Sequence, residues 1–187
     1  KLINLVIFVL FMANSLSLNA KSQAKKYHQI EWEELVPLDD LELLLNPPAS
    51  IMDIQDGSSL DSVDALAERD DLDEQTKRYY QALKSDRVVG ALNNKPVKLP
   101  GFIVPLEVNE ENKVTEFFVV PYFGACLHMP PPPPNQIVYA KVKKGFVLES
   151  LYNPYWFEGT LVTATNEHDL GNSAYQINID SFYLYEE

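Results

Sequence analysis

The chain has 187 residues, one cysteine and an excess of acids, with 15 Lys and Arg against 27 Asp and Glu and a formal charge of −12. An acidic surface repels nucleic acid and anionic lipid, so the composition argues against nucleic-acid binding. A lone cysteine cannot form an internal disulfide, and a hydrophobic core must therefore hold the fold together.

The first 20 residues have the order of a secretory signal peptide. Lys1 is followed by an apolar run over Leu2–Ala13, and small or polar residues lead to Ala20. We predict cleavage after Ala20, with Ser17 as an alternative, and export to the periplasm. The run is short for a bilayer span, although an uncleaved membrane anchor is the competing interpretation. The rest of the chain carries 14 basic and 27 acidic residues, a charge of −13, and we expect no membrane span there.

The exported part is expected to begin with a basic, unpatterned and flexible arm over 21–28, followed by a single α+β domain over 29–187. Short elements are expected over 29–37 and 41–45, before a stop at Asn46-Pro47-Pro48. Between 59 and 85, apolar residues recur at near-helical spacing among many acids. This spacing predicts one or two helices there.

From residue 87 onward the pattern becomes typical of β-strands, rich in β-branched and aromatic residues. The predicted strands are Arg87–Leu92, Val97–Val108, Val114–Tyr122, Gln136–Val142, Phe157–Asn166 and Ser173–Tyr185. Hairpin turns are predicted at Asn93–Asn94, Asn109–Asn112 and Asp169–Asn172. We therefore predict a small, mainly antiparallel OB-like barrel over 87–185, with the N-terminal helices packed outside it.

The usual catalytic signatures are missing: there is no G-x-S-x-G, no glycine-rich phosphate loop, no H-E-x-x-H and no C-x-x-C. One group of residues remains, Cys126, His128 and Met129, directly before five prolines. In an extended segment the side chains of Cys126 and His128 point to the same side. A thiolate and an imidazole suit zinc or copper, and the Met129 thioether favours reduced copper.

Two or three ligands do not close a structural zinc site, so a further ligand must come from elsewhere. His168, Glu107 or a partner protein are the candidates. Two other interpretations stay open for Cys126. In the first, Cys126 packs in the core as a small hydrophobic residue. In the second, it is a reactive thiol with His128 as its base, although nothing in the sequence supplies an oxyanion hole for such an enzyme.

The proline run, Pro130, Pro131, Pro132, Pro133 and Pro134, would span roughly 15 Å as a polyproline II rod. Such a rod can bind an aromatic groove on another protein or pack against aromatic side chains of its own chain. Tyr155 and Trp156 have the same two interpretations, as part of a binding edge or of a strand that enters the core.

Four segments together resemble the bacterial domain-of-unknown-function family 3299. They are 100–107, 116–128, the proline run with Asn135-Gln136, and 153–161. The opening Trp32-Glu33-Glu34-Leu35-Val36-Pro37 is also similar to that family. The resemblance implies an exported or lipid-anchored protein of Gram-negative bacteria, often encoded beside a three-part ABC export system. This chain lacks the N-terminal cysteine of the lipid-anchored members.

The leading hypothesis is therefore a non-enzymatic periplasmic accessory protein that binds zinc or copper or assists an ABC-type transport system. The alternative is a metal-independent adaptor whose proline and aromatic surface docks on membrane transport components. A thiol-dependent enzyme is the third hypothesis.

Overall fold

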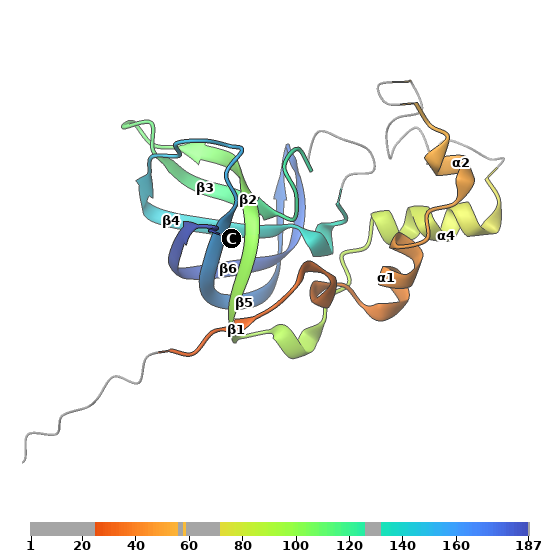
Figure 1. The fold of residues 1–187 in the computed structure, drawn as a ribbon, viewed down its shortest axis with the longest axis horizontal. Coiled ribbons are helices and arrows are strands. Elements are labelled where there is room, and N and C mark those ends of the chain that lie inside the picture. The colour runs from red at the N-terminus through yellow and green to blue at the C-terminus, as the bar shows by residue number, and fades with distance from the viewer. Residues whose placement is uncertain (1–24, 56–57, 59–71, 126–131, 187) are drawn as a thin grey trace, which may run out of the picture.

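The structure, a computed structural model, describes residues 25–55, 58, 72–125 and 132–186. Helices dominate the first half and strands the second (Figure 1). The helical elements are η1 (Trp32–Leu35), α1 (Leu38–Leu44), α2 (Ala49–Met52), α4 (Glu74–Leu83), η2 (Gly90–Leu92) and η3 (Pro134–Gln136). The strands are β1 (His28–Gln29), β2 (Lys95–Val108), β3 (Val114–Val120), β4 (Val138–Phe146), β5 (Tyr155–His168) and β6 (Gly171–Leu184).

Strands β2 to β6 form a closed barrel. Their order is β2-β3-β4-β6-β5, and a further pairing of β2 with β5 closes the ring. The β4–β6 pair is parallel, and the other barrel pairs are antiparallel. The predicted OB-like barrel in the C-terminal half is thus confirmed. The short β1 adds a parallel pairing to β2.

Barrel closure depends on β2, which changes partner along its length. Lys95–Gly101 pairs with β5, and Phe102–Val108 pairs with β3. Gly101 stands at the change of partner, where an added Cβ would lie 2.5 Å from a Val119 methyl and 2.9 Å from the Val120 carbonyl oxygen. A side chain does not fit there, so this glycine permits the close approach of β2 and β3.

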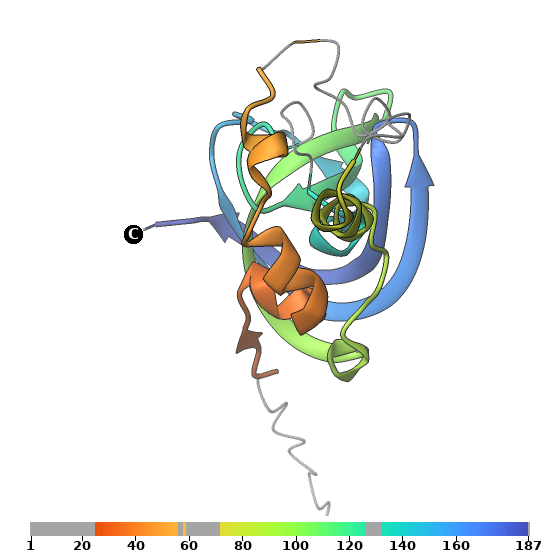
Figure 2. The same cartoon turned by 90° about the vertical axis from the view of Figure 1, so that its right-hand side faces the viewer.

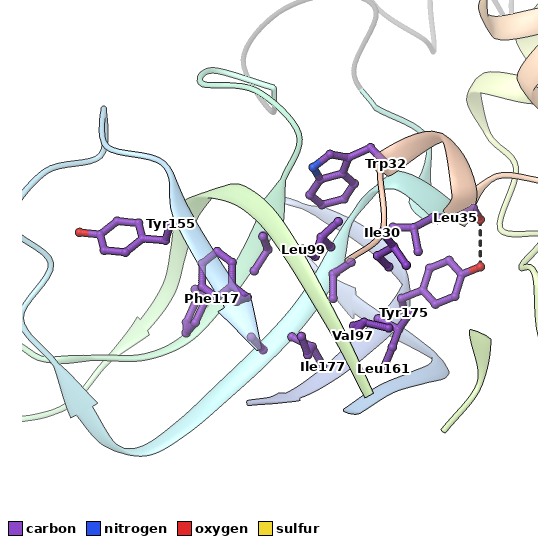
Figure 3. Packing of buried hydrophobic residues seen from close by; sticks show 14 of the residues in the cluster. Ile30, Trp32, Leu35, Val97, Leu99, Phe117, Tyr155, Leu161, Tyr175 and Ile177 are labelled. Carbon is purple, nitrogen blue, oxygen red and sulfur yellow. Dashed lines mark hydrogen bonds between the residues drawn. The ribbon is translucent and has the colours of Figure 1, made fainter. Parts of the chain in front are cut away.

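Side chains that alternate along the strands fill the barrel interior. The interior is built around Phe117, Phe157, Tyr175 and the aliphatic residues that surround them. Figure 3 shows Phe117 and Tyr175 among the side chains of this cluster. Ile30, Trp32 and Leu35 close one side of this core from outside the barrel strands. Full burial of such a side chain stabilises the fold by about 1.5–3 kcal/mol, so this cluster is the main source of stability.

The helices lie beside the barrel, as predicted, and Figure 2 shows them from their own side. Ile51, Tyr79 and Leu83 form a small separate core together with the partly buried Leu44, Ile54 and Tyr80. Asp73 caps α4 by accepting a hydrogen bond from the Thr76 amide at 2.7 Å. The predicted helical range 59–85 is confirmed over α4, and its part 59–71 lies outside the described residues. No helix of the described ranges is long and apolar enough to cross a membrane.

A buried polar contact connects α1 to the chain after α4. Asp40 accepts a hydrogen bond from the Ser85 hydroxyl at 2.5 Å, and both side chains are buried. Arg87 binds Asp40 and, through two guanidinium nitrogens, Asp39. Hydrogen bonding to Arg87 holds the pKa of Asp39 below its usual range. The Arg87 carbonyl in turn accepts from the Asn135 side chain, so the contact reaches the barrel.

Two predictions near residue 90 are wrong. Residues 87–92 form no strand, because Val88 and Leu92 pack onto the barrel core individually and the Val89 amide donates to the Tyr175 hydroxyl instead of to a strand. Asn93–Asn94 is a turn but not a hairpin. Asn94 has φ 59° and leads from η2 into β2. The remaining predicted strands and the other two hairpins are present with small shifts of their ends.

The end of the expected flexible arm makes defined contacts. Lys25 Nζ donates to Thr160 Oγ1 at 2.8 Å and to Asp180 at 2.5 Å. The Tyr27 hydroxyl donates to the same Asp180 carboxylate at 3.0 Å. Residues 25–27 therefore lie against the outside of β5 and β6.

Candidate functional site

The outer face of β2, β3 and β4 carries a second apolar cluster. Phe118 and Val120 point away from the interior residues Phe117 and Val119, since successive side chains of a strand alternate. An outer face is normally exposed, yet Phe118 and Val120 are both 0% exposed. Ala125 and Ile137, from the connection between β3 and β4, belong to this buried cluster. That connection therefore covers the outer face at both of its described ends.

A polar group borders the apolar cluster along β3 and β4. Glu116 accepts a hydrogen bond from the Tyr139 hydroxyl at 2.6 Å and pairs with Lys141. The hydrogen bond from Lys141, followed by the one from Tyr139, lowers the pKa of Glu116. Burial and the hydrogen bond to Glu116 raise the pKa of Tyr139 to about 12. The carboxylate thus stays charged and the phenol stays neutral at physiological pH.

His168, predicted as a weak metal ligand, lies beside this group at the end of β5. Its ring meets the Phe118 ring edge-on, with centroids 6.2 Å apart. Its Nδ1 accepts a hydrogen bond from the Leu170 amide at 3.1 Å, which leaves Nε2 for other partners. A neutral imidazole with a bare Nδ1 carries its proton on Nε2. Coordination through Nε2 would therefore require the Leu170 hydrogen bond to open.

Glu107, the other weak candidate, lies directly opposite Glu116 on β2, and its side chain is exposed. Its charge contributes to the raised pKa of Tyr139. Within the part of the chain that the structure describes, no three His, Cys, Asp or Glu side chains are grouped so as to hold a metal ion. Glu107 and His168 thus lie near the same face without forming a complete site by themselves.

The central candidates of the sequence, Cys126, His128 and Met129, lie outside the described residues, as do Pro130 and Pro131. The described prolines bear on the two interpretations of the run. Pro132 and Pro133 are buried within this chain, and Pro134 begins η3. This burial agrees with the interpretation in which the proline run packs against its own chain.

The two aromatic candidates have different environments. Tyr155 is buried in the barrel core. Trp156 lies on the outside and stacks on Tyr185, with ring centroids 4.9 Å apart. The ammonium of Lys98 lies 4.3 Å from the centre of the Trp156 ring. Of these two residues, only Trp156 therefore lies on the surface of the barrel.

Sequence reasoning missed Glu116 and Tyr139 on the outer face. The signal was present, because Glu116 and Phe118 are alternate residues of one predicted strand and Tyr139 lies on the next. The register that brings Glu116 opposite Lys141 and Phe118 opposite Tyr139 pairs two strands that are about 20 residues apart in sequence, and no local pattern predicts it.

These features define a closed OB-type barrel with a side group of helices and a covered outer face on β2 to β4. The chain belongs to the family described as protein of unknown function (DUF3299), whose model matches residues 32–184. It is similar to a solved structure of a DUF3299 family protein from Pseudomonas aeruginosa PAO1, with 35% sequence identity and a TM-score of 0.61. The match covers 87% of this chain and 98% of that chain. No curated protein matches.

Proposed function

We propose that this protein is an exported accessory protein that binds zinc or copper through Cys126 and His128. One observation carries the proposal: Ala125, directly before Cys126, is buried in the cluster of Phe118, and the His168 ring lies against that same Phe118. The predicted ligand run therefore leaves the described chain on the face where another potential ligand stands. In many OB folds the corresponding outer face is where ligands bind, which supports the location by analogy only.

The chemistry of the proposed ligands suits a carrier. A thiolate and one or two imidazoles leave at least one coordination position open, whereas structural zinc sites are closed by four protein ligands. The thioether of Met129 would add preference for reduced copper. We propose that the metal is exchanged with components of an ABC-type transport system, which is the setting implied by the resemblance to the family.

Metal titration of the full exported chain tests the proposal. Zinc binding is measured by calorimetry, and copper in its reduced state by competition with a chromophoric chelator. Cys126→Ser and His128→Ala are expected to weaken affinity about 100-fold or more, because even the loss of a partner that only supports a metal ligand costs about 10- to 100-fold. His168→Ala is expected to weaken metal affinity less. Metal binding through His168 Nε2 would break the hydrogen bond that Nδ1 accepts from the Leu170 amide, so this residue is expected to be a weaker ligand.

The third histidine of the chain provides the matched control. His28 is exposed on β1, on a different strand from the candidate site, so His28→Ala should leave metal affinity unchanged. The proposal fails if wild-type protein binds neither metal more tightly than the Cys126→Ser variant. It also fails if His28→Ala lowers affinity as much as His128→Ala does.

A further inference from the structure

A second surface, next to the candidate metal site and joined to it through Phe102, lies outside β2 near its change of partner. Many of the large exposed apolar side chains of the barrel are gathered on three segments that meet there: 121–124, 147–154 and the C-terminal end of β6. Phe123 packs on Tyr152 with centroids 4.6 Å apart, and its ring also meets Phe102 at 6.4 Å. Tyr152 remains 72% exposed. Contiguous apolar surface of this kind marks an interaction site.

The surface contains a groove of about 220 Å³. Aromatic rings and prolines line it: Trp32, Pro100, Phe102, Pro121, Pro154 and Tyr185. The Trp32 indole donates to the Pro100 carbonyl at 2.7 Å, which fixes the ring against the groove wall. The backbone of Gly101 also borders the groove. The groove is thus preformed by rigid side chains.

Hydrogen-bond donors stand at the edge of the groove. Among the residues that the structure describes, nothing pairs with the Tyr185 hydroxyl or the Trp156 indole N–H. Proline-rich segments in the polyproline II conformation present apolar rings and free carbonyl oxygens, and each proline lacks an N–H. Aromatic grooves with free donors are the recurrent partners of such segments.

The charges around the groove specify the occupant further. Glu186 follows Tyr185 and Glu31 precedes Trp32, and both acids are exposed. The Lys98 ammonium, 4.3 Å from the Trp156 centroid and 5.4 Å from the Tyr183 centroid, would repel a cationic ligand on that side, so a basic residue of the ligand has to lie toward the two acids. A ligand with Lys or Arg beside its prolines is therefore complementary to the groove.

We infer that this groove binds a proline-rich segment of another protein, in the polyproline II conformation and flanked by Lys or Arg. The proline run of a second copy is a poor occupant, because Pro132 and Pro133 are buried in their own chain. An anionic membrane is disfavoured by the acidic charge of the chain. The inference does not depend on metal binding.

The two tryptophans of the chain make the test direct, because Trp32 lines the groove and Trp156 stacks on its wall residue Tyr185. The full exported chain is titrated with a decaproline peptide that carries arginine at each end, and tryptophan fluorescence and calorimetry are recorded. An uncharged decaproline and a Gly-Ser peptide with the same two arginines are the control probes. Saturable binding is expected for both proline peptides, tighter for the arginine form, and none for the Gly-Ser peptide.

Variants locate the binding. Tyr185→Ala removes a groove wall and is expected to weaken binding about tenfold or more, the effect of losing an aromatic anchor. Leu170→Ala is the control, because Leu170 is 54% exposed at the turn between β5 and β6 and does not line the groove. Glu186→Gln should weaken binding of the arginine peptide by about two- to fivefold, as for an exposed ion pair, and leave the uncharged peptide unaffected.

The inference is overturned if neither proline peptide binds saturably, or if the Gly-Ser peptide binds equally well. It is also overturned if phosphatidylcholine vesicles change the fluorescence while the peptides do not, which would indicate a lipid surface. Sedimentation that shows a dimer disrupted by Tyr185→Ala would instead assign the groove to a second copy. A chelator should not change peptide binding, so loss of the metal proposal leaves this test intact.

Discussion

The Tyr175 hydroxyl donates a hydrogen bond to the Leu35 carbonyl oxygen at 2.9 Å, joining the interior of β6 to the end of η1 (Figure 3). The same hydroxyl accepts from the Val89 amide at 2.7 Å. One fully buried phenol therefore holds two segments that have no strand pairing of their own. The ring itself fills the barrel core, so its polar and apolar parts both hold the N-terminal elements in place.

Tyr175→Phe is expected to lower the free energy of unfolding by about 1–3 kcal/mol, because it leaves a carbonyl and an amide without their partner while the ring stays packed. Chemical denaturation measures the change. Tyr183→Phe is the control, since the Tyr183 hydroxyl donates to Glu158 at an exposed position. A loss no larger in Tyr175→Phe than in Tyr183→Phe would show that the buried bond adds nothing.

Gly101→Ala tests the change of partner along β2. The new methyl group would approach both the Val119 side chain and the Val120 backbone, and only the side chain can move aside. We expect a loss of about 1–3 kcal/mol in unfolding free energy, typical of overpacking. Gly90→Ala, where nothing lies within 4 Å of an added Cβ, should change stability little. Equal stability of the two variants would contradict the close contact.

Ser85→Ala tests the link between the helices and the barrel. The buried Asp40 carboxylate would lose its hydroxyl donor, and hydrogen bonds to charged groups contribute about 1.5–3 kcal/mol. Ser181→Ala removes the same kind of bond, from a hydroxyl to Glu158, at an exposed site and is expected to cost much less. Hydrogen exchange of α4 should accelerate in Ser85→Ala and not in Ser181→Ala. Uniform exchange in both variants would argue against a local link.

Glu116→Gln is expected to lower the pKa of Tyr139 below its value of about 12, because the negative hydrogen-bond acceptor is lost, but only in part, because burial, the largest cause of the raised pKa, remains. Ultraviolet absorbance during an alkaline titration reports it, with Tyr139→Phe identifying the signal. Since the folded pKa of Tyr139 is raised, its contribution to stability is complete below pH 10 and is lost as the pH rises toward 12. An unchanged titration curve in Glu116→Gln would refute the coupling.

The same pair makes a prediction on the acid side. The pKa of Glu116 is lowered in the folded state by Lys141 and Tyr139. Its contribution to stability is therefore present above the unfolded pKa of about 4.3 and is lost as the pH falls through the folded value. The decline in stability below pH 5 should be shallower in Glu116→Gln than in the wild type. Stability measured by urea denaturation between pH 3 and 7 checks this.

The barrel strands were predictable because they are rich in β-branched and aromatic residues, and because strands such as β2 bury one face and expose the other, whereas β3 is buried on both faces over Phe117–Val120. In β2 the buried residues Val97, Leu99, Gly101 and Ile103 alternate with partly exposed ones. The same reasoning failed at 87–92, where Val88 and Leu92 are apolar because they cover the end of the core. Hydrophobic content there reflects burial, whereas a strand also needs a neighbour that offers hydrogen bonds.

The candidate site was predictable only in part. His168 and Glu107 were named as ligands that the fold would have to supply, and both lie beside Glu116 or Tyr139 on the outer face. Glu116 and Tyr139 were missed because pairing between strands that are distant in sequence determines which side chains are neighbours on the outer face. The groove around Trp32 was missed for the same reason, as its walls come from segments near 32, 100, 121, 154 and 185.

The change of partner along β2 also bears on how the chain reaches its folded state. The β5–β6 hairpin joins residues near in sequence, such as His168 and Gly171, and can form early. The pairing of Lys95 with Leu161 brings together distant residues, so we expect it to form after that hairpin. Until it forms, β5 keeps an unpaired edge next to exposed core side chains such as Phe157. Completion of the ring is thus the step at which intermolecular strand pairing competes with folding.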